Sequence, residues 1–177
     1  SPITETFTLI ITDATAPDTQ ITSKPALLSN NRNPSFAFTG NDNVTPVGNL
    51  AFECKLDGDD FMSCASSTSY ANLIDGAHTF QVRAKDDSGN FDVELASYSW
   101  TIDATPPNTL IDTAPLSLTN TATATFTFHS TENDSTFICT VDDSEVTCGG
   151  GTYTTASLNN GPHTFAVAAR DHAGNVD

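Results

Sequence analysis

Four cysteines are the residues whose chemistry the sequence constrains most. Cys54 and Cys64 stand ten positions apart, and Cys139 and Cys148 stand nine apart. A four-cysteine zinc site needs ligands about two to four residues apart within each half, and this spacing lacks them. Free buried thiols are the other alternative. We favour two disulfides, Cys54–Cys64 and Cys139–Cys148, which place the chain in an oxidising, extracellular setting.

Each cysteine pair is close enough in sequence to bridge the two strands of one hairpin. With the first two cysteines opposite each other, the loop between the strands would be residues 58–60. With the second two opposite each other, Asp143-Ser144 would form a two-residue turn. Both loop lengths are common in hairpins, so the turn absorbs the changed spacing.

Carboxylates are the second group of residues that could do chemistry. The chain carries 22 Asp and Glu against six Lys and Arg, a net charge of −16. Asp predominates and favours turns, so the charge is expected in loops. This surface repels polyanions, which excludes nucleic acid and anionic lipid as partners. No apolar run approaches the ~18 residues that span a bilayer, so we predict no membrane insertion.

The histidines offer little for catalysis. His78 and His163 occupy equivalent positions at the start of a strand, and we expect only Thr, Phe and Ala near them. A catalytic histidine needs a positioned partner. The chain has no G-x-S-x-G, no phosphate loop and no H-E-x-x-H motif. We therefore predict that the protein is not an enzyme.

These residues recur because the chain contains two copies of one module. Asp13-Ala14-Thr15 returns as Asp103-Ala104-Thr105, an offset of 90 residues. The first copy has five extra residues near position 45, and the offset then falls to 85. So dense a match with one insertion indicates a duplicated unit. We place the first module at residues 13–102 and the second at residues 103–177.

Each module is predicted to be all-β. Large apolar residues alternate with small or polar ones over short runs, which is typical of half-buried antiparallel strands. In the first copy they are Phe36, Phe38, Phe52, Cys54, Leu56, Phe80, Val82, Ala84, Tyr98, Trp100 and Ile102. About seven short strands in ~90 residues predict a sandwich of two sheets.

The motifs at the module ends resemble a known group of repeats. Asp-Ala-Thr-x-Pro stands at residues 13–17 and 103–107, and Val-x-Ala-x-Asp-x-x-Gly-Asn stands at residues 82–90 and 167–175. These motifs resemble the tandem immunoglobulin-like or fibronectin-III-like repeats of bacterial surface proteins and large adhesins. The resemblance covers nearly all of both copies and implies two tandem Ig-like/FnIII-like β-sandwiches at the cell surface. The paired cysteines depart from most such repeats, which usually have none.

The acidic loops are candidate calcium sites. Residues 86–92 and 171–177 connect the last two strands of each sandwich, at the end where the chain enters, beside the linker aspartate. Ca²⁺ takes about six to eight oxygen ligands, which converging carboxylates could supply. The candidate ligands are Asp13, Asp86, Asp92, Asp103, Asp171 and Asp177. The resemblance agrees, since related repeats often bind Ca²⁺ at module junctions. The alternative is a plain turn in which Gly-Asn supplies positive φ and Asp makes local hydrogen bonds.

The two copies are cut out of phase. The second copy stops at Asp177, so it lacks its own last strand. Residues 1–12 precede the first linker, and Phe7, Leu9 and Ile11 alternate as a strand does. We expect residues 1–12 to be the last strand of a preceding module, or a donor strand that completes residues 103–177 of the next chain.

We therefore predict an extracellular structural repeat segment that forms a rigid stalk or spacer of a bacterial surface adhesin, with adjacent modules as its partners. The first alternative is a subunit of an extracellular filament, joined head to tail to neighbouring copies by donation of the N-terminal strand. An alternative of another class is an accessory carbohydrate- or ligand-binding module of a secreted enzyme.

Overall fold

A computed structural model describes residues 6–9 and 11–177, and it divides into two compact units. Unit 2 holds Ile102–Asp177 and two short pieces, Leu28–Arg32 and Ile74–Gly76, and unit 1 holds the rest. The sequence boundary between residues 102 and 103 lies beside this division. No helix among the described residues has the length and apolar character needed to cross a membrane.

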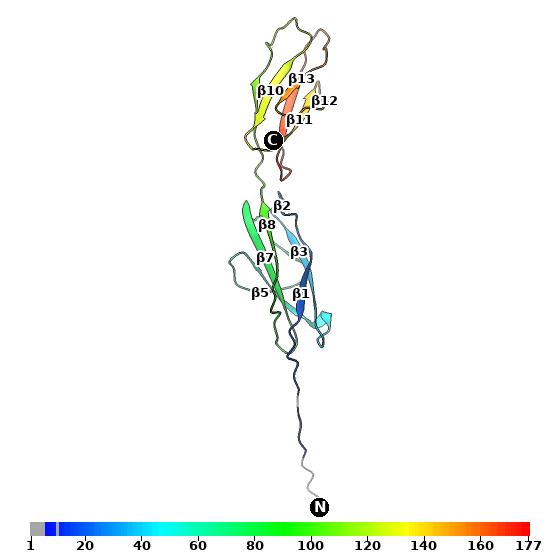
Figure 1. Cartoon of the computed structure of the whole chain (residues 1–177), viewed down its shortest axis with the longest axis vertical. Helices are drawn as coiled ribbons and strands as arrows, with labels where there is room; N and C mark the ends of the chain where they lie inside the picture. The colour runs from blue at the N-terminus through cyan, green and yellow to red at the C-terminus, as the bar shows by residue number, and fades with distance from the viewer. Residues whose placement is uncertain (1–5, 10) are drawn as a thin grey trace, which may run out of the picture. The chain divides into compact units, whose positions relative to one another are not determined.

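The first module folds as a β-sandwich of two facing sheets. One sheet has the order β1-β3-β6, and the other has the order β2-β8-β7-β4-β5. Figure 1 shows β1 and β3 running beside β7 and β8. The strands are β1 (Asp18–Ser23), β2 (Leu28–Ser29), β3 (Ser35–Asn41), β4 (Ala51–Leu56), β5 (Met62–Cys64), β6 (Thr68–Ser69), β7 (Gly76–Lys85) and β8 (Ala96–Ile102). A single 3-10 turn, Val47–Asn49, is the only helical element described in this module.

Aromatic side chains from both sheets make the core of the first module. Phe36 on β3 stacks on Phe80 of β7, with ring centroids 4.2 Å apart. Trp100 on β8 covers this pair, its ring centroid 5.2 Å from that of Phe36. All three side chains are almost completely buried. The alternation in the sequence therefore predicted the inward face of these strands correctly.

The second module repeats this arrangement with fewer strands. Its sheets have the orders β13-β10-β9 and β12-β11-β14. The strands are β9 (Thr109–Thr113), β10 (Thr125–Ser130), β11 (Thr136–Val141), β12 (Ser144–Val146), β13 (Thr152–Thr154) and β14 (Phe165–Arg170). Among the described residues, no strand of this module corresponds to β2 or β8. One edge of β14 consequently has no neighbouring strand in the described chain.

Both predicted disulfides are present, but the predicted hairpin registers are wrong. Cys54 is bonded to Cys64 and Cys139 to Cys148, with Cα–Cα distances of 5.8 and 6.0 Å. In the strand ladders, however, Cys54 lies opposite Met62, so the first bridge runs diagonally to Cys64.

Turn geometry explains the changed register. In the second hairpin Cys139 lies opposite Val146, and Val141 lies opposite Ser144. The turn is therefore Asp142-Asp143 instead of Asp143-Ser144. Both of these residues have positive φ, 49° and 61°. A two-residue hairpin turn of type I′ requires positive φ at both positions, and Asp tolerates it better than Ser does.

Candidate functional site

Three carboxylates from separate segments converge at one end of unit 1. Asp13 lies in the segment before β1, Asp42 follows β3, and Asp86 follows β7. One oxygen from each lies within 4.8 Å of the other two. We call these residues the first acidic cluster.

Unit 2 contains a second acidic cluster, formed by Asp103, Glu132 and Asp171 and meeting the same distance limit. Its members are the repeat equivalents of the first three, at offsets of 90, 90 and 85 residues. The duplication has therefore kept three acidic side chains together in both modules.

An asparagine holds each cluster together. The backbone N–H of Asn90 donates to Asp86 Oδ1 at 2.7 Å, and its Nδ2 donates to Asp86 Oδ2 at 2.7 Å and to the carbonyl of Asp13 at 3.1 Å. Asn175 makes the same bonds to both oxygens of Asp171 and to the carbonyl of Asp103. The Gly-Asn motif thus fixes the loop after β7 or β14 to the linker aspartate.

Two oxygens of the first cluster are buried without a hydrogen-bond partner. Asp13 Oδ1 accepts from the N–H of Thr15 at 3.0 Å, and Asp42 Oδ2 accepts from the N–H groups of Val44 and Thr45 at 2.9 and 2.7 Å. The remaining oxygens, Asp13 Oδ2 and Asp42 Oδ1, are buried and bonded to nothing in the described chain. A buried carboxylate oxygen that has no hydrogen-bond partner carries an uncompensated desolvation cost. A cation bound between these two oxygens would compensate that cost.

The electrostatics of the clusters follow from burial and like charge. Burial raises the pKa of Glu132, and the nearby carboxylates of Asp103 and Asp171 raise it further. Hydrogen bonds from the N–H groups of Thr45 and Val44 lower the pKa of Asp42. Within residues 6–9 and 11–177, the ion pairs to Lys, Arg and His involve no member of either cluster.

Four of the six predicted calcium ligands belong to the acidic clusters: Asp13 and Asp86 lie in the first, and Asp103 and Asp171 lie in the second. Asp92 instead accepts the N–H of Glu94 at 2.9 Å, and Asp177 accepts the N–H of Thr109 at 2.7 Å. Neither belongs to an acidic cluster. Sequence reasoning missed Asp42 and Glu132, because Asp42 lies where the two copies differ in length. Their equivalence at the offset of 90 residues was the available signal.

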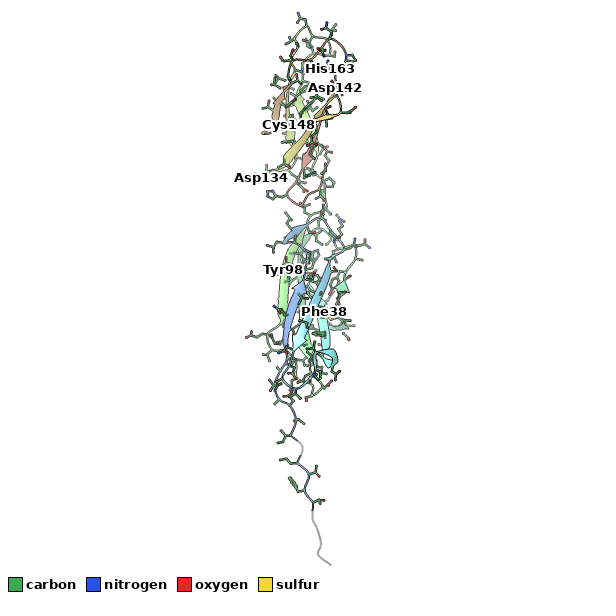
Figure 2. All side chains as sticks on the ribbon, turned by 90° about the vertical axis from the view of Figure 1, so that its right-hand side faces the viewer. Phe38, Tyr98, Asp134, Asp142, Cys148 and His163 are labelled. Atoms are coloured by element: carbon green, nitrogen blue, oxygen red, sulfur yellow. A yellow bond between two sulfur atoms is a disulfide. The ribbon has the colours of Figure 1, made fainter. Side chains whose placement is uncertain are left out.

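The prediction that the histidines lack a partner is wrong. His78 Nδ1 lies 2.8 Å from Asp57 Oδ2, and His163 Nδ1 lies 2.7 Å from Asp142 Oδ2. Figure 2 shows Asp142 beside His163. The other oxygen of each aspartate accepts the backbone N–H of the residue after the histidine, at 2.7 and 2.8 Å. The carboxylate therefore ties the hairpin turn to the next strand.

This pairing shifts the pKa values of both partners in unit 2 in opposite directions. The hydrogen bond that His163 donates to the Asp142 carboxylate raises the pKa of His163, and the bond to the Asn159 carbonyl adds to this effect. The hydrogen bond from His163 lowers the pKa of Asp142. The pair is a structural contact repeated in both modules.

The three predicted donor-strand residues are fully described and lie in no strand. Phe7, Leu9 and Ile11 are 89%, 70% and 86% exposed. The rest of the predicted segment falls in part on residues 1–5 and 10, which lie outside the described residues.

No family model and no curated protein matches the chain. Solved structures do match. The chicken CNTN1 FN1–FN3 domains are 12% identical with a TM-score of 0.49, covering 90% of this chain and 62% of that one. The central fibronectin-III array of RIM-binding protein is 14% identical with a TM-score of 0.34, covering 94% and 69%. A tetra-tandem repeat in the extending region of a large adhesion protein is 25% identical with a TM-score of 0.31, covering 93% and 48%.

Proposed function

We propose that this chain is an extracellular structural segment, a stalk or spacer within a longer surface adhesin of bacterial origin, and that each module binds Ca²⁺ at its acidic cluster. The observation that carries the proposal is duplication. The disulfide, the Asp–His pair and the acidic cluster each occur once per module. A spacer needs modules that hold their shape, and each of these features fixes a loop or turn.

The donor atoms of the clusters favour calcium. Carboxylate oxygens are the ligands that Ca²⁺ and Mg²⁺ prefer, and Ca²⁺ tolerates irregular geometry and the higher coordination number. Asp13 Oδ2 and Asp42 Oδ1 would supply two oxygens in unit 1, with backbone carbonyls and water completing the shell. In unit 2 the ion would relieve the repulsion between Glu132 and its two neighbours. It would also fix Asp103, the residue through which the chain enters β9.

Calorimetric titration of Ca²⁺ into the metal-free chain tests the calcium site. We expect two sites, one of which disappears in Asp13→Asn and the other in Glu132→Gln. Asp60→Asn is the matched control, because it removes an exposed charge that belongs to neither cluster. If the titration releases or absorbs no heat, or if Asp60→Asn loses a calcium site as the other two variants do, the calcium proposal is contradicted.

Small-angle scattering tests the mechanical role. If calcium stiffens the spacer, EGTA should broaden the distribution of interatomic distances, and excess Ca²⁺ should restore it. An unchanged distribution would refute the stiffening. A glycan and protein binding screen separates the spacer from the accessory-module alternative, because only the latter requires a saturable ligand.

A further inference from the structure

One outer face of the first module carries a row of cations and aromatic rings. The buried residues of β4 and β7 point into the core, so the residues that alternate with them point outward. The outward residues include Lys55 on β4 and Arg83 and Lys85 on β7, which are three of the chain's six Lys and Arg residues. We call these three, together with the rings of Phe61 and Phe91, the cationic face.

The two phenylalanine rings join the cations into one row. Arg83 Cζ lies 4.2 Å from the ring centroid of Phe61 and 4.3 Å from that of Phe91. Lys55 Nζ lies 5.1 Å from the Phe61 centroid, and Lys85 Nζ lies 5.0 Å from the Phe91 centroid. A cation within about 6 Å of a ring centroid is attracted by the quadrupole of the ring. The rings therefore hold three like charges beside one another.

Only the central cation of this row has a carboxylate partner. Arg83 Nε and Nη2 donate to Glu53 Oε2 at 2.9 and 2.6 Å. In the described part of the chain, no carboxylate pairs with Lys55 or Lys85, although acidic residues outnumber Lys and Arg by 22 to six. All three cations are half-buried, so they remain accessible from outside. Because the Arg83–Glu53 pair is neutral as a whole, the face keeps the two lysine charges.

The fold does not require the cationic face. At the offset of 85 residues, the second module has Thr140 in place of Lys55, Ala168 in place of Arg83 and Val176 in place of Phe91. Strand β11 nevertheless pairs with β14 in the same register in which β4 pairs with β7. The cationic face is therefore a feature of the first module alone, on a sheet that also forms without it.

The two unpaired lysines have the spacing of residues in an extended peptide. Lys55 lies opposite Gln81, which stands four residues from Lys85 on β7. Four residues of an extended strand span about 13 Å. Two carboxylates that stand four residues apart in an extended segment have the same separation. The neutral Arg83–Glu53 pair would then face the middle of that segment.

Two observations favour a peptide over an acidic polysaccharide as the occupant. Each ring already contacts two cations, which leaves little ring surface on which a sugar could stack. The net charge of −16 also repels a long polyanion. A short segment held within about 8 Å of the lysines is screened from more distant carboxylates by salt.

We propose that the cationic face binds a short, extended segment of a partner protein in which two acidic residues stand four positions apart. One carboxylate pairs with the ammonium group of Lys55 and the other with that of Lys85. Because ring contacts already restrain both lysine side chains, binding has less side-chain entropy to lose. The segment lies across β4 and β7, and its binding does not require calcium.

Nuclear magnetic resonance titration of the full chain in EGTA tests this proposal separately from the calcium sites. The probe is a seven-residue peptide with Asp at its second and sixth positions and Thr elsewhere. We expect it to shift the amide signals of β4 and β7. Lys55→Gln and Lys85→Gln should each weaken its binding about 2–5-fold, the range measured for exposed ion pairs.

Lys24→Gln is the matched control. Lys24 also contacts an aromatic ring, since its Nζ lies 4.3 Å from the ring centroid of Tyr98, but it does not belong to the cationic face. This variant should bind the peptide as the parent chain does. A peptide that does not bind, or an equal loss of binding in Lys24→Gln and Lys55→Gln, would overturn the proposal.

Three further measurements can refute the assignment of the occupant. A peptide with its two Asp residues side by side should bind more weakly, and equal binding would refute the spacing argument. An oligomer of galacturonic acid that binds more tightly than the peptide, and through the same lysines, would show that the partner is a polysaccharide. Self-association of the chain in sedimentation velocity that Lys55→Gln abolishes would show that the occupant is a second copy.

Discussion

Replacement of Asp13 by Asn should change the stability of unit 1 in opposite directions with and without calcium. The carboxylate oxygens of the first acidic cluster lie within 4.8 Å of one another. Two unit charges at that distance repel by about 0.9 kcal/mol at the dielectric constant of water. Asp13 faces two such charges, so removal of its charge should relieve about 1 kcal/mol once salt screening at physiological ionic strength is included.

The expected shifts are large enough to measure by calorimetry. In EGTA, Asp13→Asn should raise the melting temperature of unit 1 by about 4–8 °C for each kcal/mol of repulsion that it removes. With calcium at ~100 times its dissociation constant, the parent chain gains about 2.7 kcal/mol, which the variant loses. The order of the two melting temperatures should therefore reverse when calcium is added.

Asp60→Asn, which removes an exposed charge from the same unit, should show no such reversal. A variant that melts below the parent chain in EGTA would show that the cluster is not under charge repulsion. A variant that melts above the parent chain in calcium would show that Asp13 does not bind the ion.

Three further perturbations test the structure. Removal of the Cys139–Cys148 bridge by double Cys→Ser replacement should lower the stability of unit 2 by about 2.6 kcal/mol on the chain-entropy treatment of a nine-residue separation, and the transition of unit 1 in calorimetry should not move. Gly151→Ala should destabilise unit 2 by about 2–4 kcal/mol in urea unfolding, because its Cβ would lie 2.7 Å from the Phe128 carbonyl at φ +78°. Gly150→Ala, with φ +63° and no atom within 4 Å, should cost only about 1 kcal/mol, and equal costs would contradict the steric reason. The Asp142–His163 pair should stabilise unit 2 most between pH 3.8 and 6.5, the ordinary pKa values of the two groups. The lowered pKa of Asp142 makes its contribution disappear as the pH falls through the folded value, and the raised pKa of His163 makes its contribution disappear as the pH rises through the folded value. Asp142→Asn should flatten this profile of melting temperature against pH, whereas Asp143→Asn should leave it intact.

The strands and their inward faces could be predicted from the sequence, because burial imposes a strict two-residue period on residues such as Phe36 and Phe38. The register of the cysteine hairpins could not. The register depends on whether Asp142-Asp143 or Asp143-Ser144 occupies the turn. Moving the turn by one residue changes the cross-strand partner of every residue by two positions. Side-chain polarity cannot distinguish these registers, since both keep Cys139 facing inward.

The acidic clusters show a second limit of sequence reasoning. The repeat identified Asp13, Asp86 and their equivalents, since they flank obvious motifs. Asp42 lies in a loop of different length in the two copies, and only the fold brings the end of β3 to the linker. The histidine partners Asp57 and Asp142 were missed for a related reason. Each lies 21 residues before its histidine, and only the antiparallel pairing of β4 with β7, or of β11 with β14, brings the two together.

The two modules share the stacked phenylalanine pair, the disulfide, the Asp–His pair and the acidic cluster. Calcium binding as we propose it would act through the charges around Asp13 and Asp103. Salt should therefore weaken calcium binding in both modules, and an affinity that does not change with salt would contradict a site built from carboxylates.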